Sequence, residues 1–191
     1  MNDEFFVMTL NLNARLQPFV RDKLEDAVNE MLEKANIGET DGGGTLMEKS
    51  GEISECDVFF NLRKECFDND LNAAMEMAVR IVSGFGYLVP QGSSIICEGV
   101  VCKVGTAEGL ALYLDGVNLE EKVYKECSTD HIIEEMEKRF NGKGHFMSHW
   151  TGAEETALYF YGDSYDEMYE IVDDFAADYP LCENCRIIRI A

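Results

Sequence analysis

The second half of this chain repeats the residue pattern of the first half, and this repeat limits the possible folds more than any other property. Residues 42–47 (GGGTLM) align with residues 142–147 (GKGHFM), and residues 55–60 (ECDVFF) align with residues 155–160 (ETALYF). Both alignments have the same offset of 100 residues. Since such a repeat indicates that each copy forms one structural unit, we expect the 191 residues to fold as two related units in tandem.

Hydrophobic periodicity predicts the same order of elements in both copies, namely strand, helix, strand, strand, helix, strand. Alternation marks the strands, and a spacing of three or four residues marks the helices. In the first copy the elements are expected over residues 6–12, 18–35, 45–49, 55–62, 70–82 and 94–98. In the second copy they are expected over residues 110–114, 128–140, 145–150, 154–161, 165–176 and 186–190. The glycines at 42–44 are interpreted as a turn that leads into the second strand.

This element order resembles the ferredoxin-like, or split βαβ, architecture. The resemblance implies an α+β protein with two tandem βαββαβ units, each a four-stranded antiparallel sheet with two helices on one face. We expect the first unit in residues 1–98, a linker in residues 99–108, and the second unit in residues 109–191 with a short helical insertion near residues 117–129. The likeness is one of pattern, and no characterised family accompanies it.

The net charge of the chain limits the classes of partner that it can bind. The formal net charge is −21, with 37 acidic and 16 basic residues spread over both halves. Such a surface repels phosphate backbones and anionic membranes, and it favours a basic protein partner. RNA-recognition modules share the expected topology, but they need basic residues that are scarce here. We therefore expect neither nucleic acid nor a membrane as a partner, and no membrane-spanning segment.

The cysteines indicate a reducing compartment. Seven cysteines form an odd and scattered set, unlike a secreted disulfide scaffold, and the start Met1-Asn2-Asp3-Glu4 does not resemble a signal peptide. We therefore expect a cytoplasmic protein.

The spacing of Cys182 and Cys185 suits a metal or redox pair. The paired histidines at 145 and 149 are expected on the opposite sheet edge, so we predict no metal site and no cofactor.

Nothing in the sequence indicates an enzyme. No nucleophile motif is present, and the glycine-rich segments precede strands, whereas phosphate loops precede helices. Glu55 and Glu155 recur at equivalent strand starts, where a salt bridge or a solvated edge is the expected role. We therefore predict a non-enzymatic protein.

The most informative feature is the face of the second sheet that should point away from its leucines. Ala111 and Tyr113 on one strand, and Ala157, Tyr159 and Tyr161 on the next, share this face. One interpretation, which we favour, is that two bare sheet faces or two chains pack together here, which would allow a homodimer through the open face. The other is that the tyrosines form a partner or ligand surface, because tyrosine provides a large amphipathic contact area.

These patterns lead to two hypotheses about function. The first is an acidic protein-binding module of the immunity or inhibitor type that neutralises a basic partner, with the aromatic residues Tyr113, Trp150, Tyr159 and Tyr161 as its contacts. The alternative is a small-molecule sensor or regulatory domain that binds its ligand on the sheet face or between the two units.

Overall fold

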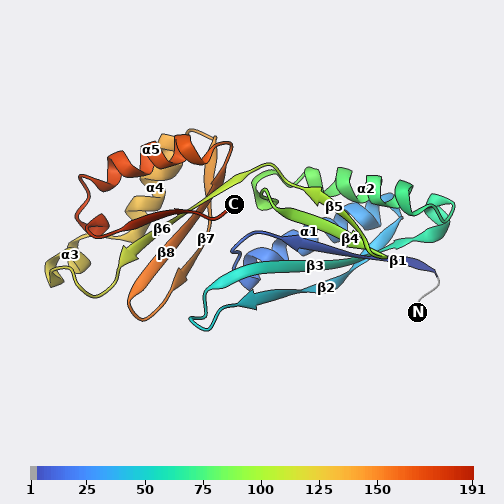
Figure 1. The fold of residues 1–191 in the computed structure, drawn as a ribbon, viewed down its shortest axis with the longest axis horizontal. Coiled ribbons are helices and arrows are strands. Elements are labelled where there is room, and N and C mark those ends of the chain that lie inside the picture. The colour runs from blue at the N-terminus through green and yellow to red at the C-terminus, as the bar shows by residue number, and fades with distance from the viewer. Residues whose placement is uncertain (1–3) are drawn as a thin grey trace.

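The structure of the chain, a computed structural model, describes residues 4–191, which form nine strands and five α-helices (Figure 1). The first part contains β1 (Phe5–Leu12), α1 (Pro18–Ala35), β2 (Gly38–Met47), β3 (Ile53–Arg63), α2 (Leu71–Ser83), β4 (Ser93–Cys97) and β5 (Val100–Val104). The second part contains β6 (Glu108–Asp115), α3 (Glu121–Glu126), α4 (Thr129–Phe140), β7 (Gly144–Thr151), β8 (Glu155–Gly162), α5 (Tyr165–Ala176) and β9 (Arg186–Arg189).

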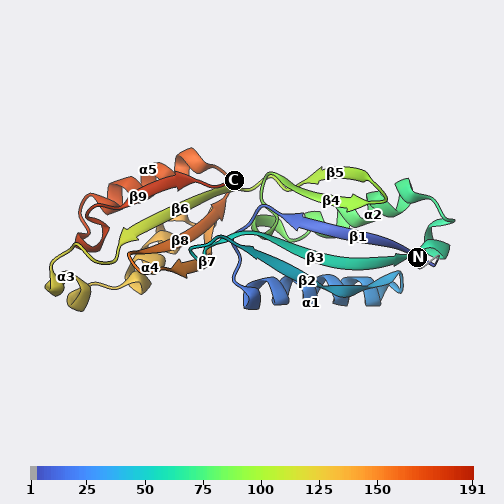
Figure 2. The ribbon, with the colours of Figure 1, turned by 60° about the horizontal axis from the view of Figure 1, so that its bottom comes forward.

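The strands form two separate antiparallel sheets, and the helices of each unit lie on one face of its sheet (Figure 2). The strand order is β2-β3-β1-β4-β5 in the first sheet and β7-β8-β6-β9 in the second. Four strands of the first sheet therefore have the same order as the whole second sheet. The prediction of two tandem ferredoxin-like units is confirmed.

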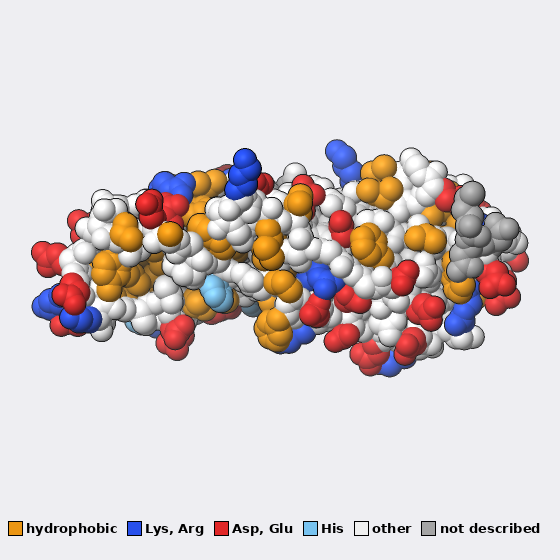
Figure 3. Space-filling view, turned by 90° about the horizontal axis from the view of Figure 1, so that it is seen from below, with side chains coloured by type: hydrophobic (Ala, Val, Ile, Leu, Met, Phe, Trp, Pro, Cys, Tyr) orange, Lys and Arg blue, Asp and Glu red, His pale blue; other side chains and the backbone are white. Residues whose placement is uncertain are grey.

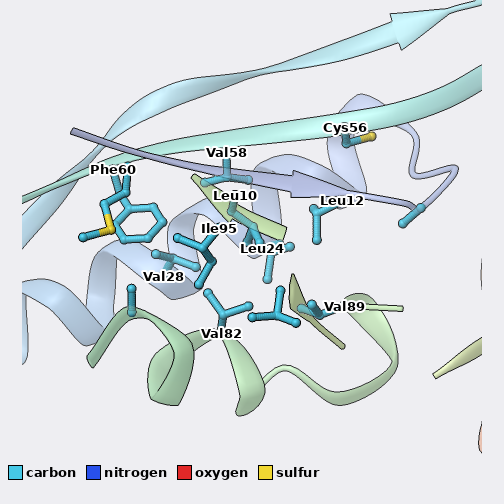
Figure 4. Close-up of a cluster of buried hydrophobic side chains, with 14 of the residues drawn as sticks. Leu10, Leu12, Leu24, Val28, Cys56, Val58, Phe60, Val82, Val89 and Ile95 are labelled. Carbon is cyan, nitrogen blue, oxygen red and sulfur yellow. The ribbon is translucent and has the colours of Figure 1, made fainter. Parts of the chain in front are cut away.

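Each unit has its own packed core between sheet and helices. In the first unit the inward residues Leu10, Val58 and Phe60 meet the helix residues Val28 and Val82, and all five are fully buried (Figure 4). In the second unit the inward leucines of β6 pack against α4 and α5. Because successive strand residues point to opposite faces, the residues between these inward positions lie on the face without helices.

The segment expected to be a linker contains a strand, so the boundary at residues 99–108 is corrected. Val100–Val104 forms β5, which pairs with β4 through a two-residue turn at Glu98 and Gly99. Both turn residues have positive φ, 48° and 83°, as a type I′ hairpin requires. Only residues 105–107 separate β5 from β6.

The glycines at 42–44 are also placed differently from the prediction, because they lie inside β2 and not in a turn before it. The pairing of β2 with β3 shifts register between Thr40 and Gly43, which is a β-bulge. A Cβ at Gly43 would clash with the backbone carbonyl oxygen of Asp57 on β3, which cannot move aside as the Arg21 side chain could, so this position of β2 requires glycine. The predicted short helix near residues 117–129 is present as α3.

Among the described helices, none combines the length and the apolar composition that crossing a membrane requires.

Candidate protein-binding surface

The tyrosine face of the second sheet is an internal interface. Tyr113 is 6% exposed, and Tyr159 and Tyr161 are 0% exposed. They point away from the leucines of β6, as predicted, but they pack with the core residues of the first unit. The expectation that these tyrosines form an exposed binding surface is therefore wrong, because the connections of the first unit that contain Arg15 and Glu52 form hydrogen bonds to them.

Glu52, in the turn between β2 and β3, organises the polar part of this interface. Its Oε1 accepts hydrogen bonds from Tyr159 Oη at 2.7 Å, from Tyr113 Oη at 2.5 Å, and from the guanidinium of Arg15. The backbone N–H of Arg15 donates to Tyr161 Oη at 2.9 Å. Each tyrosine hydroxyl thus has a partner, which is what burial of a polar group requires.

Burial holds the tyrosines in their neutral form. Burial raises the pKa of Tyr159, and the nearby carboxylate of Glu52 raises it further. Burial also raises the pKa of Tyr161, against a smaller opposing effect of the Arg15 backbone. A phenolate here would lose hydration and face a carboxylate, so these groups stabilise a contact and are poorly suited to proton transfer.

Two further contacts join the units. Gln17 donates from its backbone N–H to Ser148 Oγ at 3.1 Å and from its side chain to the carbonyl of His149 at 2.6 Å. Tyr87 Oη donates to Asp163 Oδ1 at 2.9 Å. Trp150, on β7, is half-buried and packs against the core of the first unit. All four aromatic residues predicted to contact a partner therefore lie at or beside the contact between the units.

The face without helices in the first unit has the opposite character, because it is open to solvent. The strand registers place Val101, Ile96, Thr9 and Phe59 in one row across β5, β4, β1 and β3. Ile96 is 36% exposed and Val101 is 60% exposed. Val7, on the same face of β1, is 54% exposed. We call this set, Val7, Thr9, Phe59, Ile96 and Val101, the open face.

An acidic rim borders the open face on the side of β3. Asn11 donates to Glu55 Oε2 at 3.1 Å and to Asp57 Oδ1 at 3.0 Å, which orients both carboxylates. Within residues 4–191, neither carboxylate forms an ion pair with a basic side chain. Over the first unit, at the right of Figure 3, hydrophobic side chains form separate patches among polar and acidic ones. An apolar centre with an acidic rim is typical of a protein-binding surface.

The cysteine pair lies far from the histidines. Cys182 is buried and Cys185 is half-buried before β9, whereas His145 lies on β7, at the other edge of the sheet. Burial, with the neighbouring thiols Cys185 and Cys127, raises the pKa of Cys182 to about 12, which disfavours the thiolate needed for redox chemistry or metal binding. In the part of the chain described, no group of three or more His, Cys, Asp and Glu is arranged to hold a metal ion.

Sequence reasoning missed Arg15 and Glu52, which form hydrogen bonds with the buried tyrosines. Both lie in connections of the first unit, and no local pattern marks them. The carboxylates that the repeat aligned have different roles, since Glu155 pairs with Arg186 at 2.8 Å and Glu55 accepts from Asn11.

No protein-family model and no curated protein sequence matches the chain. Solved structures with some similarity include the first two RRM domains of a yeast poly(U)-binding protein, Pub1, at 11% identity and a TM-score of 0.24, covering 97% of this chain and 99% of that one. The regulatory subunit of aspartate kinase from Thermus flavus has 14% identity and a TM-score of 0.24, covering 90% and 93%. A heme-binding protein from Thermus thermophilus has 13% identity and a TM-score of 0.29, covering 97% and 88%. At these scores the likenesses carry no argument about function.

Proposed function

We propose that this chain is a non-enzymatic protein-binding module and that the open face of the first sheet is its contact surface. The observation that carries the proposal is the difference between the two helix-free faces. In the second sheet the tyrosines of β6 and β8 are buried against the first unit, whereas the first sheet exposes Val7, Ile96 and Val101 on β1, β4 and β5. A group of apolar side chains on an otherwise polar surface commonly marks an interaction site.

The charge of the chain favours a basic partner. A net charge of −21 accelerates the approach of a cationic protein, and the oriented carboxylates of Glu55 and Asp57 offer acceptors beside the apolar row. The specific form of the proposal is an immunity or inhibitor protein that neutralises a basic protein. The seven free cysteines are consistent with action in the reducing cytoplasm.

Affinity capture from the native host tests this proposal with matched variants. The wild-type chain is compared with a Val7→Lys/Ile96→Lys double variant of the open face, and with Ile188→Lys on β9 as a control of similar exposure. We expect a basic protein to be retained by the wild type and the control, to be lost from the double variant, and to bind more weakly at higher salt. Equal retention by all three proteins, or retention of acidic proteins alone, would contradict the proposal.

A small-molecule sensor remains the second candidate. The interface between the units is filled by Tyr113, Tyr159 and Tyr161, which removes the support for a ligand site there. The remaining support is an apolar groove of about 500 Å³ between α2 and β5, within the size range of ligand sites. A metabolite that raises the melting temperature in a saturable manner would favour this candidate.

A further inference from the structure

The two sheets have four edges, and three of them carry features that prevent pairing with another strand. β2 contains a bulge and packs along α1. β7 contains a register shift between Phe146 and Ser148. β9 is four residues long and carries Arg186 and Arg189. Bulges, short length and charged side chains are the usual protections of an edge strand.

The fourth edge, β5, has no bulge, and Lys103 is its one charged residue. All five residues of Val100–Val104 pair regularly with β4, and four of the five are Val or Cys. Val100 is 44% exposed and Val101 is 60% exposed. Figure 2 shows β5 along one long side of the molecule, at the rim of the first sheet. A regular apolar edge of this kind is a template for addition of another strand.

We propose that the occupant of this edge is a second copy of the chain, whose β5 pairs with the first in antiparallel orientation about a two-fold axis. The result is one continuous ten-stranded sheet made from two five-stranded sheets. Antiparallel pairing in one sheet requires the axis to be perpendicular to the sheet, so the helices of both copies lie on the same side and α2 meets its counterpart. This is an isologous contact.

The groove between α2 and β5 supports a second copy in preference to a lone peptide. Met75 and Val79 on α2, together with Val100, Val101 and Cys102, line this open groove of about 500 Å³. The two-fold axis brings two such grooves together, which adds apolar side-chain contacts to the main-chain hydrogen bonds of the strand pair. A single extended peptide would pair with β5 but would leave the α2 side of the groove open.

The charges around β5 are self-complementary. In a pair centred on Cys102, Lys103 lies opposite Val101 of the other copy and not opposite another lysine. Glu76 and Arg80 both line the groove on α2, so a second copy meets charges of both signs there. This region has charges of both signs, whereas the whole chain carries −21. Charges of both signs in this contact reduce the repulsion between two such chains.

Sedimentation velocity of the full chain over a wide concentration range tests the inference. We expect the wild type to form dimers and Val101→Lys, which places Lys opposite Lys103 twice, to raise the dimer dissociation constant by about 100-fold. Val101→Asp places a carboxylate opposite Lys103, so it should retain the dimer. Adding Lys103→Asp to Val101→Lys should restore the dimer, because opposite charges then face each other at positions 101 and 103. Val7→Lys is the matched control on the open face and should have no effect on the dimer.

Oxidative cross-linking tests the register of the proposed β5–β5 pair, which is centred on Cys102. Facing residues of an antiparallel pair lie about 4.5 to 5.5 Å apart at Cα, within the range that a disulfide spans. In a Cys66→Ser background, which removes the exposed thiol, copper phenanthroline should link two copies through Cys102, and Cys102→Ser should abolish the link.

Three results would overturn the inference, and they are distinct from failure of the proposed function because no heterologous partner is present. The first is a wild type that stays monomeric at every concentration. The second is a dimer that resists Val101→Lys. The third is a dimer lost on Val7→Lys, which would assign self-association to the open face.

Discussion

The first and second units share one strand order, yet their helix-free faces differ in how far they are exposed to solvent. In the second unit the face presents Tyr113, Tyr159 and Tyr161, and contacts with the first unit bury these three side chains. In the first unit the equivalent face presents Val7 and Thr9 on its central strand and stays open. The comparison teaches that aromatic residues on a bare sheet face do not by themselves indicate an external binding surface.

The chemistry of the side chains explains the difference. A tyrosine buries a large ring and still offers a hydroxyl, so it suits an interface with polar loops. Glu52 and Arg15 provide those polar partners. The open face of the first unit has three aliphatic side chains beside Thr9 and Phe59, with an acidic rim, and its aliphatic side chains are exposed in the described chain. One face thus joins the units, and the other is free for a different molecule.

Removal of the Glu52 side chain should destabilise the tyrosine face of the second sheet more than any other change. Glu52→Ala leaves the guanidinium of Arg15 and the hydroxyls of Tyr113 and Tyr159 without their shared acceptor. We expect the free energy of unfolding to fall by about 2 kcal/mol, because the lost hydrogen bonds are charge-assisted and the Arg15–Glu52 pair is only partly buried. Urea denaturation measures the change, with the exposed Glu48→Ala as the control in the same turn. A loss below about 1 kcal/mol would show that the network contributes little.

High pH should have the second largest effect, because it destabilises the protein through Tyr159 and Tyr161. The pKa values of Tyr159 and Tyr161 are raised in the folded protein, so above about pH 10 the unfolded chain releases these protons while the folded chain retains them. The unfolded state then binds fewer protons, and stability falls as pH rises, by about 1.4 kcal/mol per pH unit for each tyrosine. Urea midpoints across this pH range measure the slope. A Tyr159→Phe/Tyr161→Phe variant should have a shallower slope, and an unchanged slope would contradict the assignment.

Loss of a single tyrosine hydroxyl should have a smaller effect. Tyr159→Phe keeps the ring and removes one hydrogen bond to the Glu52 carboxylate, so we expect a loss of about 1.5 kcal/mol. Tyr169→Phe, on an exposed part of α5, is the control and should change nothing measurable. A double-mutant cycle with Glu52→Ala should show strong non-additivity, because both changes remove the same bond. Additive losses would indicate that the two side chains act separately.

Changes on the open face should have the smallest effect on folding. Val7→Lys and Ile96→Lys replace exposed side chains, so each should alter the free energy of unfolding by no more than about 0.5 kcal/mol. The same urea experiment measures them beside the tyrosine variants. A loss of several kcal/mol from either change would show that this face is packed in solution and is unavailable to a partner.

Much of the fold could be predicted from residue patterns, because alternation and the repeat are local signals. The leucines of β6 and the intervening Ala111 and Tyr113 lie on opposite faces, as their alternation predicted. β5 was missed because its type I′ turn uses Glu98, where Asn or Asp is the usual signal.

The burial of the tyrosines could not be predicted in this way, because it depends on contacts between residues distant in sequence. Glu52 and Tyr159 are 107 residues apart, and Arg15 and Tyr113 are 98 apart. Local periodicity shows which face a side chain occupies, but it does not show what covers that face.

Hydroxyl-radical footprinting of the intact free chain, read out by mass spectrometry, tests the central contrast most directly. Tyr113, Tyr159 and Tyr161 should be oxidised far more slowly than Tyr169, which is 38% exposed, while Val7 and Ile96 should be modified readily. Rapid oxidation of the three tyrosines, at the rate of Tyr169, would show that the first unit does not cover them in solution and would contradict the account.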